Sequence, residues 1–378
     1  MWIILSLINI VISYFADKSF KNNKINCKIY LLFLVIINTV ILGLRDFGVG
    51  ADSVAYVKDY FYFAASLHNF NDFFYESYYD KGYILLAWIS TLVSHNPQAL
   101  LVITELFIIS ILTIGIYRYK KLLNCNITWF MTFFVLSYQF ETINLMRQFC
   151  AMTILVCGFT YFLEKKYLQY AICQILAYFF HSSSIVFIIV PFVLFVSEKD
   201  GKTKFIAAIG IITFFVIVIG FYTTFLKTIT ETHLLNETYM TRYGENSIYA
   251  NDGQQGLMGQ LKDTVILILQ LTFVFFTYKH KKINQNFTYI LVMLIVCSYL
   301  LTSMRMISVY FFRLAYYVGL VLIIYLSMIL KTVRIKEMIP FFCIILLFTV
   351  QIMGAYRYYG YSQTGSVENI YKSSILSL

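Results

Sequence analysis

Two polar clusters that interrupt apolar stretches could bind a charged ligand. Arg147 and Gln148 open one apolar run, and His181 ends the next run. The polar turn 164–166 between the two runs predicts an antiparallel helical hairpin, so both clusters return to the same side. A fixed cation beside a titratable imidazole suits an anionic headgroup. The alternative is structural: Arg147 extends to the interface and His181 caps a helix.

Two further arginines, Arg305 and Arg313, lie eight residues apart near the start of another apolar run. Eight residues are close to two helical turns, so both side chains should share one helix face. Arg313 should lie about two turns deeper, where an arginine needs a phosphate or a carboxylate as its partner. An acid from another helix is the structural alternative. Glu105, also inside an apolar run, is interpreted as a residue that hydrogen-bonds between helices.

The segment after the second apolar run combines charge with glycine, in Arg45-Asp-Phe-Gly-Val-Gly-Ala-Asp-Ser. Its two glycines allow a sharp turn or a close approach to a ligand. Arg45 supplies a cation, and Asp46 and Asp52 supply carboxylates. Asp52 is interpreted either as a catalytic acid or as the N-cap of a helix that starts at Val54, and the two roles are compatible.

The composition indicates that these residues belong to a membrane protein. The 378 residues are 60% hydrophobic and 13% charged, whereas ordinary soluble domains have about 25% charged residues. Most apolar runs are long enough to cross ~30 Å of hydrocarbon as helices. We predict an all-α polytopic integral membrane protein in which 1–378 form a single transmembrane domain. The runs lie at 1–15, 28–44, 82–94, 98–117, 127–143, 146–163, 167–181, 183–197, 205–226, 263–278, 287–303, 306–330 and 338–354.

The run 82–94 differs from the others in length. It would span only ~20 Å as a helix. Arg45 and Arg118 are expected on opposite sides of the membrane, which needs an odd number of crossings, yet two runs lie between them. We therefore predict that 82–94 is re-entrant or interfacial, which leaves about twelve transmembrane helices (11–13). The alternative is a crossing by 54–70, which contains two charged residues.

Charge predicts the orientation of the helices. A net charge of +10 could indicate nucleic-acid binding in a soluble chain, but here Lys and Arg lie in short loops, as the positive-inside rule expects for cytoplasmic loops. These basic loops are 18–28, 118–121, 164–166, 199–204, 279–282 and 331–336. The larger loops 45–81 and 227–263 and the tail 355–378 are then extracytoplasmic. None of the seven cysteines forms a Cys-x-x-Cys pair, so neither disulfides nor a metal cluster are indicated.

The motifs resemble, in order along nearly the whole chain, those of the EpsG-like branch of the Wzy polysaccharide polymerases. Each motif is short, and the match rests on their order and on their placement at one membrane face. The matching motifs are Arg45-Asp-Phe-Gly-Val-Gly-Ala-Asp with Tyr56, Lys81-Gly-Tyr, Asn144 with Arg147-Gln-Phe, His181-Ser-Ser, Arg313 with Tyr316-Tyr, and Asn369-Ile-Tyr-Lys-Ser-Ser.

The resemblance implies a glycosyltransferase of the bacterial cytoplasmic membrane. It would join oligosaccharide repeat units, carried on undecaprenyl pyrophosphate, into an O-antigen, capsule or exopolysaccharide at the outer face. The expected catalytic base is His181, with Asp52 as the second choice. Arginines would neutralise the departing pyrophosphate. The residues expected to bind substrate are Arg45, Arg147, Gln148, Arg305 and Arg313.

The resemblance also sets the expected partners and the alternatives. The partners are lipid-linked oligosaccharides, the bilayer, a chain-length regulator and a flippase, with no nucleic acid. No cofactor is expected: a divalent cation could assist the pyrophosphate, but no ligand cluster indicates one. A ligase that attaches finished glycan uses similar chemistry and is the second interpretation. A lipid-linked-oligosaccharide flippase would place charges along a deep cavity, and an acyltransferase would need its histidine within reach of a cytoplasmic donor.

Overall fold

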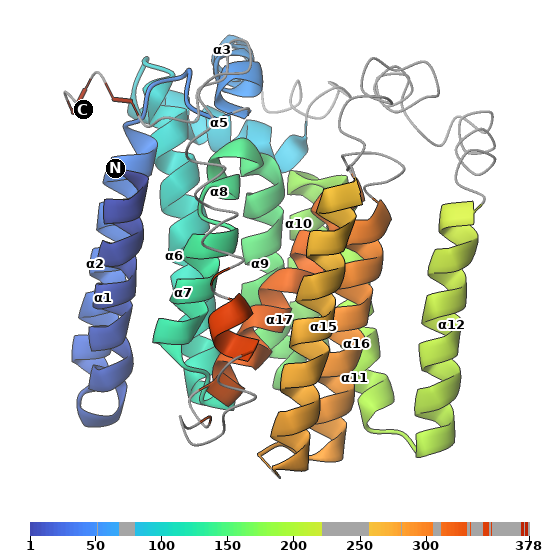
Figure 1. Cartoon of the computed structure of the whole chain (residues 1–378). Helices are drawn as coiled ribbons and strands as arrows, with labels where there is room; N and C mark the ends of the chain where they lie inside the picture. The colour runs from blue at the N-terminus through green and yellow to red at the C-terminus, as the bar shows by residue number, and fades with distance from the viewer. Residues whose placement is uncertain are drawn as a thin grey trace. The chain divides into compact units, whose positions relative to one another are not determined.

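The computed structural model describes residues 1–50, 52–67, 80–220, 257–280, 282–304 and 311–330, with short pieces at 333, 343–347, 349, 372–373 and 375–376. The described residues form helices and turns and no β-sheet (Figure 1). The chain divides into two compact units. Unit 1 contains 1–185, 323–331 and 349–378, and unit 2 contains 186–322 and 332–348. That 1–378 form a single transmembrane domain stays a prediction.

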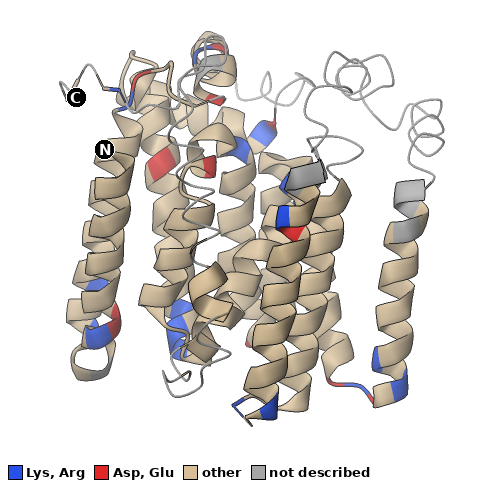
Figure 2. Ribbon diagram, viewed as in Figure 1, with Lys and Arg blue, Asp and Glu red and all other residues tan. Residues whose placement is uncertain are grey.

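Seven of the described helices are long and apolar enough to cross a membrane, as the sequence predicts for an all-α polytopic membrane protein. Figure 2 shows that the charged residues of α1, α2 and α15 lie near the ends of these helices. The total of about twelve transmembrane helices stays a prediction. The seven spans are Trp2–Phe20, Lys24–Gly43, Gln98–Leu123, Met146–Leu163, Gln260–Lys279, Gln285–Ser303 and Phe312–Leu330.

Unit 1 is a helical bundle in which α1 packs on α2, α2 on α6, α6 on α9 and α9 on α10. A short π-helix, η1 (Ser53–Val57), precedes α3. The α-helices are α1 (Trp2–Asn22), α2 (Lys24–Gly43), α3 (Lys58–Ser66), α5 (Lys81–Val93), α6 (Gln98–Leu123), α7 (Ile127–Ser137), α8 (Glu141–Asn144), α9 (Met146–Leu163) and α10 (Tyr167–Phe180).

Three asparagines set the boundaries of helices in unit 1. The side chain of Asn23 accepts hydrogen bonds from two backbone N–H groups in the first turn of α2, and Asn126 accepts one from the first turn of α7. Asparagine is a favoured N-cap because its oxygen satisfies N–H groups that have no partner within the helix. Asn124 adopts a left-handed backbone (φ 51°) and ends α6.

The predicted hairpin is formed by α9 and α10, which pack antiparallel. A Cβ added to Gly158 would lie 2.5 Å from the Cβ of Cys173, so glycine allows the two helices to approach closely. Next to this contact, the rings of Phe159 and Phe162 in α9 pack against the ring of Tyr170 in α10. The hairpin therefore brings the beginning of α9 and the end of α10 to the same end of unit 1.

The basic loops of unit 1 lie together at the opposite end, which we call the Lys120 end. The Nζ atom of Lys120 lies 2.8 Å from Asp17, and that carboxylate also accepts hydrogen bonds from the start of α7. Arg118 pairs with Glu164 at 3.2 Å, and Lys28 lies over the ring of Tyr117. Loops 18–28, 118–121 and 164–166 thus share one end of the bundle, as the positive-inside pattern predicts.

The short helix α5 begins and ends at the other end of unit 1, which we call the Arg147 end. At its start, Asp80 pairs with Arg147 at 2.7 Å. Beyond its last residue, Gln98 donates hydrogen bonds to the carbonyls of Gly43 and Arg45. Its 13 residues reach only ~20 Å. Helix α5 therefore returns to the end from which it starts, as predicted for 82–94.

Residues from the C-terminal part of the chain also lie at the Arg147 end. The backbone N–H of Asp46 donates to the carbonyl of Lys372 at 2.8 Å, and the hydroxyl of Ser373 donates to the carbonyl of Leu44. These contacts agree with the prediction that the tail 355–378 shares a side with Arg45. The rest of that tail, apart from 375–376, lies outside the described residues.

Unit 2 contains its own helical bundle, in which α11 and α15 pack on α16. Lys204, from the basic loop 199–204, donates a 2.8 Å hydrogen bond to Asn286 at the start of α16. Helix α17 continues into unit 1 from Ile323. The elements are η2 (Ser182–Ile188), α11 (Ile189–Ser197), α12 (Gly201–Gly220), α15 (Leu257–Lys279), α16 (Gln285–Ser303), η4 (Phe311–Leu314) and α17 (Ala315–Leu330).

Three boundaries differ from the sequence prediction. The run 127–143 is helical only to Ser137 and then turns before α8. Helix α15 starts at Leu257, inside the predicted loop 227–263. The run 183–197 starts as a 3-10 helix and becomes α-helical at Ile189; Pro191, in the first turn of α11, has no N–H with which to continue an α-helix from the preceding turn. Most of 338–354 lies outside the described residues.

Candidate active site

Arg147 is held at the start of α9 by three side chains from a different part of unit 1. Its Nη1 atom donates to Asp80 at 2.7 Å and to the hydroxyl of Tyr60 at 3.1 Å. Its guanidinium carbon lies 4.0 Å from the ring centroid of Tyr56 and 5.6 Å from that of Tyr60. Stacking and pairing of this kind fix the plane of a guanidinium group. Arg147 is therefore oriented before any ligand binds.

The opposite edge of Arg147 makes no hydrogen bond to the part of the chain that the structure describes. Both hydrogen bonds that Arg147 makes to described residues come from Nη1, and its buried Nε has no acceptor among those residues. A buried N–H without an acceptor is unfavourable. The side chain keeps 18% of its surface exposed. An oxyanion such as a phosphate has the acceptors that Nε and Nη2 would pair with in the bidentate manner typical of arginine.

Asp52 lies six residues after the turn's Asp46 and is buried, with 8% of its surface exposed. Its charge interacts with that of Arg147. It occupies the N-cap position of η1 without a side-chain capping bond to that helix, so the capping role predicted for it is not seen in this geometry. The π-helix then places Tyr56 on the guanidinium. Such π-helical turns are rare and are frequent at functional sites.

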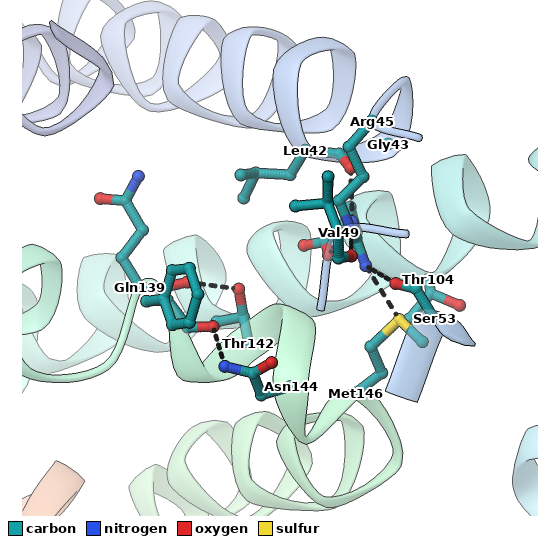
Figure 3. A network of polar contacts seen from close by, with 12 residues as sticks. Leu42, Gly43, Arg45, Val49, Ser53, Thr104, Gln139, Thr142, Asn144 and Met146 are labelled. Carbon is teal, nitrogen blue, oxygen red and sulfur yellow. Dashed lines mark hydrogen bonds and ion pairs between the residues drawn. The ribbon is translucent and has the colours of Figure 1, made fainter. Parts of the chain in front are cut away.

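Arg45 has a different environment, shown in Figure 3. It is completely buried and pairs with the equally buried Glu105 at 2.9 Å. All five of its N–H groups have acceptors. These acceptors are the carbonyls of Leu42 and Val49, the carboxylate of Glu105, the Ser53 hydroxyl and the Met146 sulfur. Arg45 therefore offers no donor to a substrate, and Glu105 joins two elements as the sequence predicts.

The turn that follows Arg45 is packed against the break between α8 and α9. Gly50 has a φ of +95°, a conformation that disfavours other residues. A Cβ on Gly50 would lie 2.7 Å from the carbonyl oxygen of Ile143. This glycine is required for both its backbone angle and its contact, and it brings η1 next to the start of α9.

His181 ends α10, at the Arg147 end as predicted. Its neighbour Phe180 packs against Gly82, two residues after Asp80. The backbone N–H of Ser183 donates to the Nδ1 atom of His181 at 3.3 Å, and the Ser183 hydroxyl lies 2.7 Å from the same atom. An acceptor role for Nδ1 favours the neutral imidazole with its proton on Nε2. In that form the ring donates a hydrogen bond from Nε2 and is not a base at that atom.

A family model matches the chain over residues 28–366, and its description is "EpsG family". The match covers most of the sequence, including every residue of the geometry above. The chain belongs to the EpsG family. No curated protein and no solved structure matches it. The family match confirms the resemblance stated from the motifs.

The structure gives the positions of two of the three remaining predicted substrate residues of this EpsG protein. Gln148 is buried in α9 with 3% of its surface exposed. Arg313 lies in unit 2, in the 3-10 helix η4 at the start of the span Phe312–Leu330, and not in a continuous α-helix. Arg305 lies outside the described residues, so the predicted shared face of the two arginines is not tested.

The sequence prediction missed the residues that hold Arg147. Tyr56 and Tyr60 are four residues apart, so they reach the same side of a helical segment. Asp80 directly precedes the Lys81-Gly-Tyr motif. These two features of the sequence could have indicated that Tyr56, Tyr60 and Asp80 belong to the site. What they could not give is the pairing partner, since Asp80 and Arg147 are 67 residues apart.

Asp80 lies outside the membrane spans and its ionisation is altered by its surroundings. Burial raises the pKa of the Asp80 carboxyl above its ordinary value, and the neighbouring Arg147 guanidinium acts in the opposite direction. Asp80 therefore takes up a proton at a higher pH than an exposed aspartate would. Protonation removes the charge that holds Nη1 of Arg147.

Proposed function

We propose that this EpsG protein polymerises oligosaccharide repeat units carried on undecaprenyl pyrophosphate. The family match supports a role in making polysaccharide. The observation that carries the proposal is Arg147, an oriented arginine with a buried Nε that lacks an acceptor among the described residues. The donor pyrophosphate supplies that acceptor. The site would lie at the outer face of the cytoplasmic membrane.

The reaction exchanges one bond at the anomeric carbon for another. The C1–O bond between the donor sugar and its pyrophosphate breaks, and the acceptor hydroxyl oxygen bonds to C1. The hydroxyl proton passes to a base, and negative charge develops on the pyrophosphate. An enzyme accelerates such a step by stabilising the departing charge and by accepting the proton.

Arg147 stabilises the departing pyrophosphate in this proposal. Its Nε–Nη2 edge binds a phosphate oxygen, while Asp80 and the tyrosines keep its other edge fixed. A preoriented donor needs no reorganisation as charge develops. Gln148, Arg305 and Arg313 stay proposed substrate residues.

We assign the base to Asp52 and a hydrogen-bond donor role to His181, which reverses the order suggested by the sequence. The reason is the acceptor role of His181 Nδ1 toward Ser183. A neutral imidazole with the proton on Nε2 can donate to a phosphate oxygen or to a sugar. Asp52 is a carboxylate whose charge acts on Arg147, so in this proposal it accepts the proton of a hydroxyl held near that arginine. Substitution of Asp52 and of His181 tests the two roles.

Deleting the gene in its native host and separating the surface glycan by size tests the proposed function. We expect loss of the long-chain ladder, with single repeat units accumulating on lipid at the outer face. Complementation with wild type should restore the ladder, and Arg147→Ala at equal protein level should not. Arg118→Ala is the matched control, because Arg118 also has a carboxylate partner and a ring contact but lies at the Lys120 end.

The same experiment separates the alternatives. Repeat units confined to the inner leaflet would indicate a flippase. Full-length polymer that stays on its carrier lipid would indicate a ligase. An unchanged ladder with altered acylation would indicate an acyltransferase. Each of these three results would contradict the polymerase assignment.

A further inference from the structure

Arg45 is the one fully buried arginine among the described residues. Its five donors are all engaged, so its charge is directed inward and not toward a ligand. Two of its acceptors adjoin residues of the candidate active site in sequence. Ser53 follows Asp52, and Met146 precedes Arg147.

Both of these acceptors are reached by one nitrogen atom. Nη2 of Arg45 lies 3.0 Å from the Ser53 hydroxyl and 3.2 Å from the Met146 sulfur. The start of η1 and the start of α9, which are 93 residues apart in sequence (146 minus 53), therefore meet at one planar group. Figure 3 shows Ser53 and Met146 converging on the Arg45 side chain.

The other side of the guanidinium is anchored in the bundle. Nη1 is paired with Glu105 of α6, and Nε donates to the carbonyl of Val49 at 3.2 Å. Both charged side chains have no exposed surface. A buried pair is costly to desolvate and gives little net stability, but removing one partner leaves an uncompensated buried charge, so the pair resists displacement.

The packing around the pair is tight and agrees with this anchoring role. The Tyr83 hydroxyl lies 3.2 Å from Thr104, the residue before Glu105, and 4.0 Å from the Met146 sulfur. Gln98 binds the carbonyl of Arg45. The group that holds Ser53 and Met146 is thus itself held by α5 and α6.

We propose that Arg45, clamped by Glu105, is a positioning residue that sets the placement of Asp52 relative to Arg147. This proposal rests on the proposed function for its catalytic consequence only. The geometric consequence is independent of any activity. An arginine is needed because a lysine has one nitrogen and cannot place five donors in a fixed plane.

The catalytic test compares Arg45→Lys with wild type in proteoliposomes supplied with an undecaprenyl-pyrophosphate-linked oligosaccharide. We expect kcat to fall about 100-fold with KM changed little, because a displacement of about 1 Å between reacting groups has an effect of this size. Arg118→Lys, which alters a partly exposed ion pair at the Lys120 end, should retain wild-type kcat. A folded Arg45→Lys variant with wild-type kcat would overturn the proposal.

A milder pair of substitutions covers the case in which Arg45→Lys does not fold. The double variant Ser53→Ala, Met146→Leu removes the two acceptors of Nη2 and leaves the Arg45–Glu105 pair intact. It should fold and show the same selective loss of kcat. Wild-type kcat in this double variant would also contradict the positioning role.

A spectroscopic measurement tests the placement without any substrate. Spin labels on Ala55→Cys and Lys165→Cys, both exposed, report the distance between η1 and the α9–α10 hairpin. The seven native cysteines are buried or half-buried, and labelling of the protein without the new cysteines gives the background. We expect a narrow distance distribution that broadens in the double variant, and no change for a Lys18–Lys165 pair.

The two readouts separate the possible failures. A wild-type protein that does not polymerise, with broadening in the double variant, would contradict the proposed function and support the positioning role. A distribution that stays narrow in the double variant would contradict the positioning role whatever the activity.

Discussion

At the scale of single residues, the buried Arg45 and the partly buried Arg147 have opposite roles. Arg45 has acceptors for all five donors, whereas Arg147 has a fixed edge and an available one. The sequence identifies both as charges that a membrane protein keeps for a reason. It does not distinguish them, because the acceptors of Arg45 include backbone carbonyls and a carboxylate 60 residues away.

The assignment of Asp52 as the base predicts a large loss on removing its charge. Asp52→Asn keeps the size of the side chain and removes its ability to accept a proton. The polymerisation rate should fall by about 10²–10⁴-fold, the usual contribution of a general base. His181→Gln, which keeps a hydrogen-bond donor, should lose less. Initial rates of chain elongation measure both, and the reverse order would return the base to His181.

The raised pKa of Asp80 predicts a dependence on pH. As the pH falls through that raised pKa, Asp80 becomes neutral and releases Nη1 of Arg147, so the rate should fall on the acidic side. The effect on the stability of the fold has the opposite sign. A raised pKa means that the folded protein favours the protonated carboxyl, so Asp80 contributes most to stability below its ordinary pKa. That contribution is lost as the pH rises through the raised value. Asp80→Asn should have a lower rate at neutral pH and an altered acidic limb, because only the catalytic base then produces it. Rate–pH profiles of the two proteins check this, and an unchanged acidic limb in Asp80→Asn would exclude Asp80 as its origin.

At the scale of elements, the short helix α5 determines the site. Charge parity and length predicted from the sequence that 82–94 does not cross the membrane, and the contacts of Asp80 and Gln98 agree. The close packing of Gly82 on Phe180 was not predictable. A glycine that follows a lysine can serve a turn, a cap or a helix contact, and the partner decides which one applies.

The return of α5 to its starting end can be measured by thiol labelling. Cysteines introduced at Ala65 and Asn96, which are both exposed and flank α5, should react with a membrane-impermeant maleimide from the same side of sealed vesicles. A cysteine at Lys165, at the Lys120 end, should react only from the other side. Labelling of the first two positions from opposite sides would show that α5 crosses.

The turn at Gly50 gives a prediction about stability. Gly50→Ala forces a side chain into a positive φ and against a carbonyl oxygen, so it should destabilise the protein by about 1–3 kcal/mol. Gly48→Ala is the matched control two residues away, where an added Cβ meets no atom within 4 Å. Thermal unfolding in detergent compares the two. Equal melting temperatures would mean that the turn relaxes without cost.

At the scale of the whole molecule, the sequence was sufficient for the class of protein and for the order of its motifs. Composition and apolar runs predict an all-α membrane protein, and the motifs lead to the EpsG family. The arrangement around Arg147 could not be predicted from the sequence. It depends on contacts between Tyr60, Asp80 and Arg147, and the lengths of the segments between these residues do not indicate that they come together. The division of the chain into two units also has no signal in the composition.

The measurement that tests the central claim most directly is chain elongation by purified Arg147→Lys in proteoliposomes with a lipid-pyrophosphate-linked oligosaccharide. A lysine keeps the charge but cannot present the Nε–Nη2 edge. The account predicts that elongation falls about 100-fold or more, while Arg118→Lys elongates at nearly the wild-type rate. A folded Arg147→Lys protein that elongates chains as fast as wild type would contradict the account.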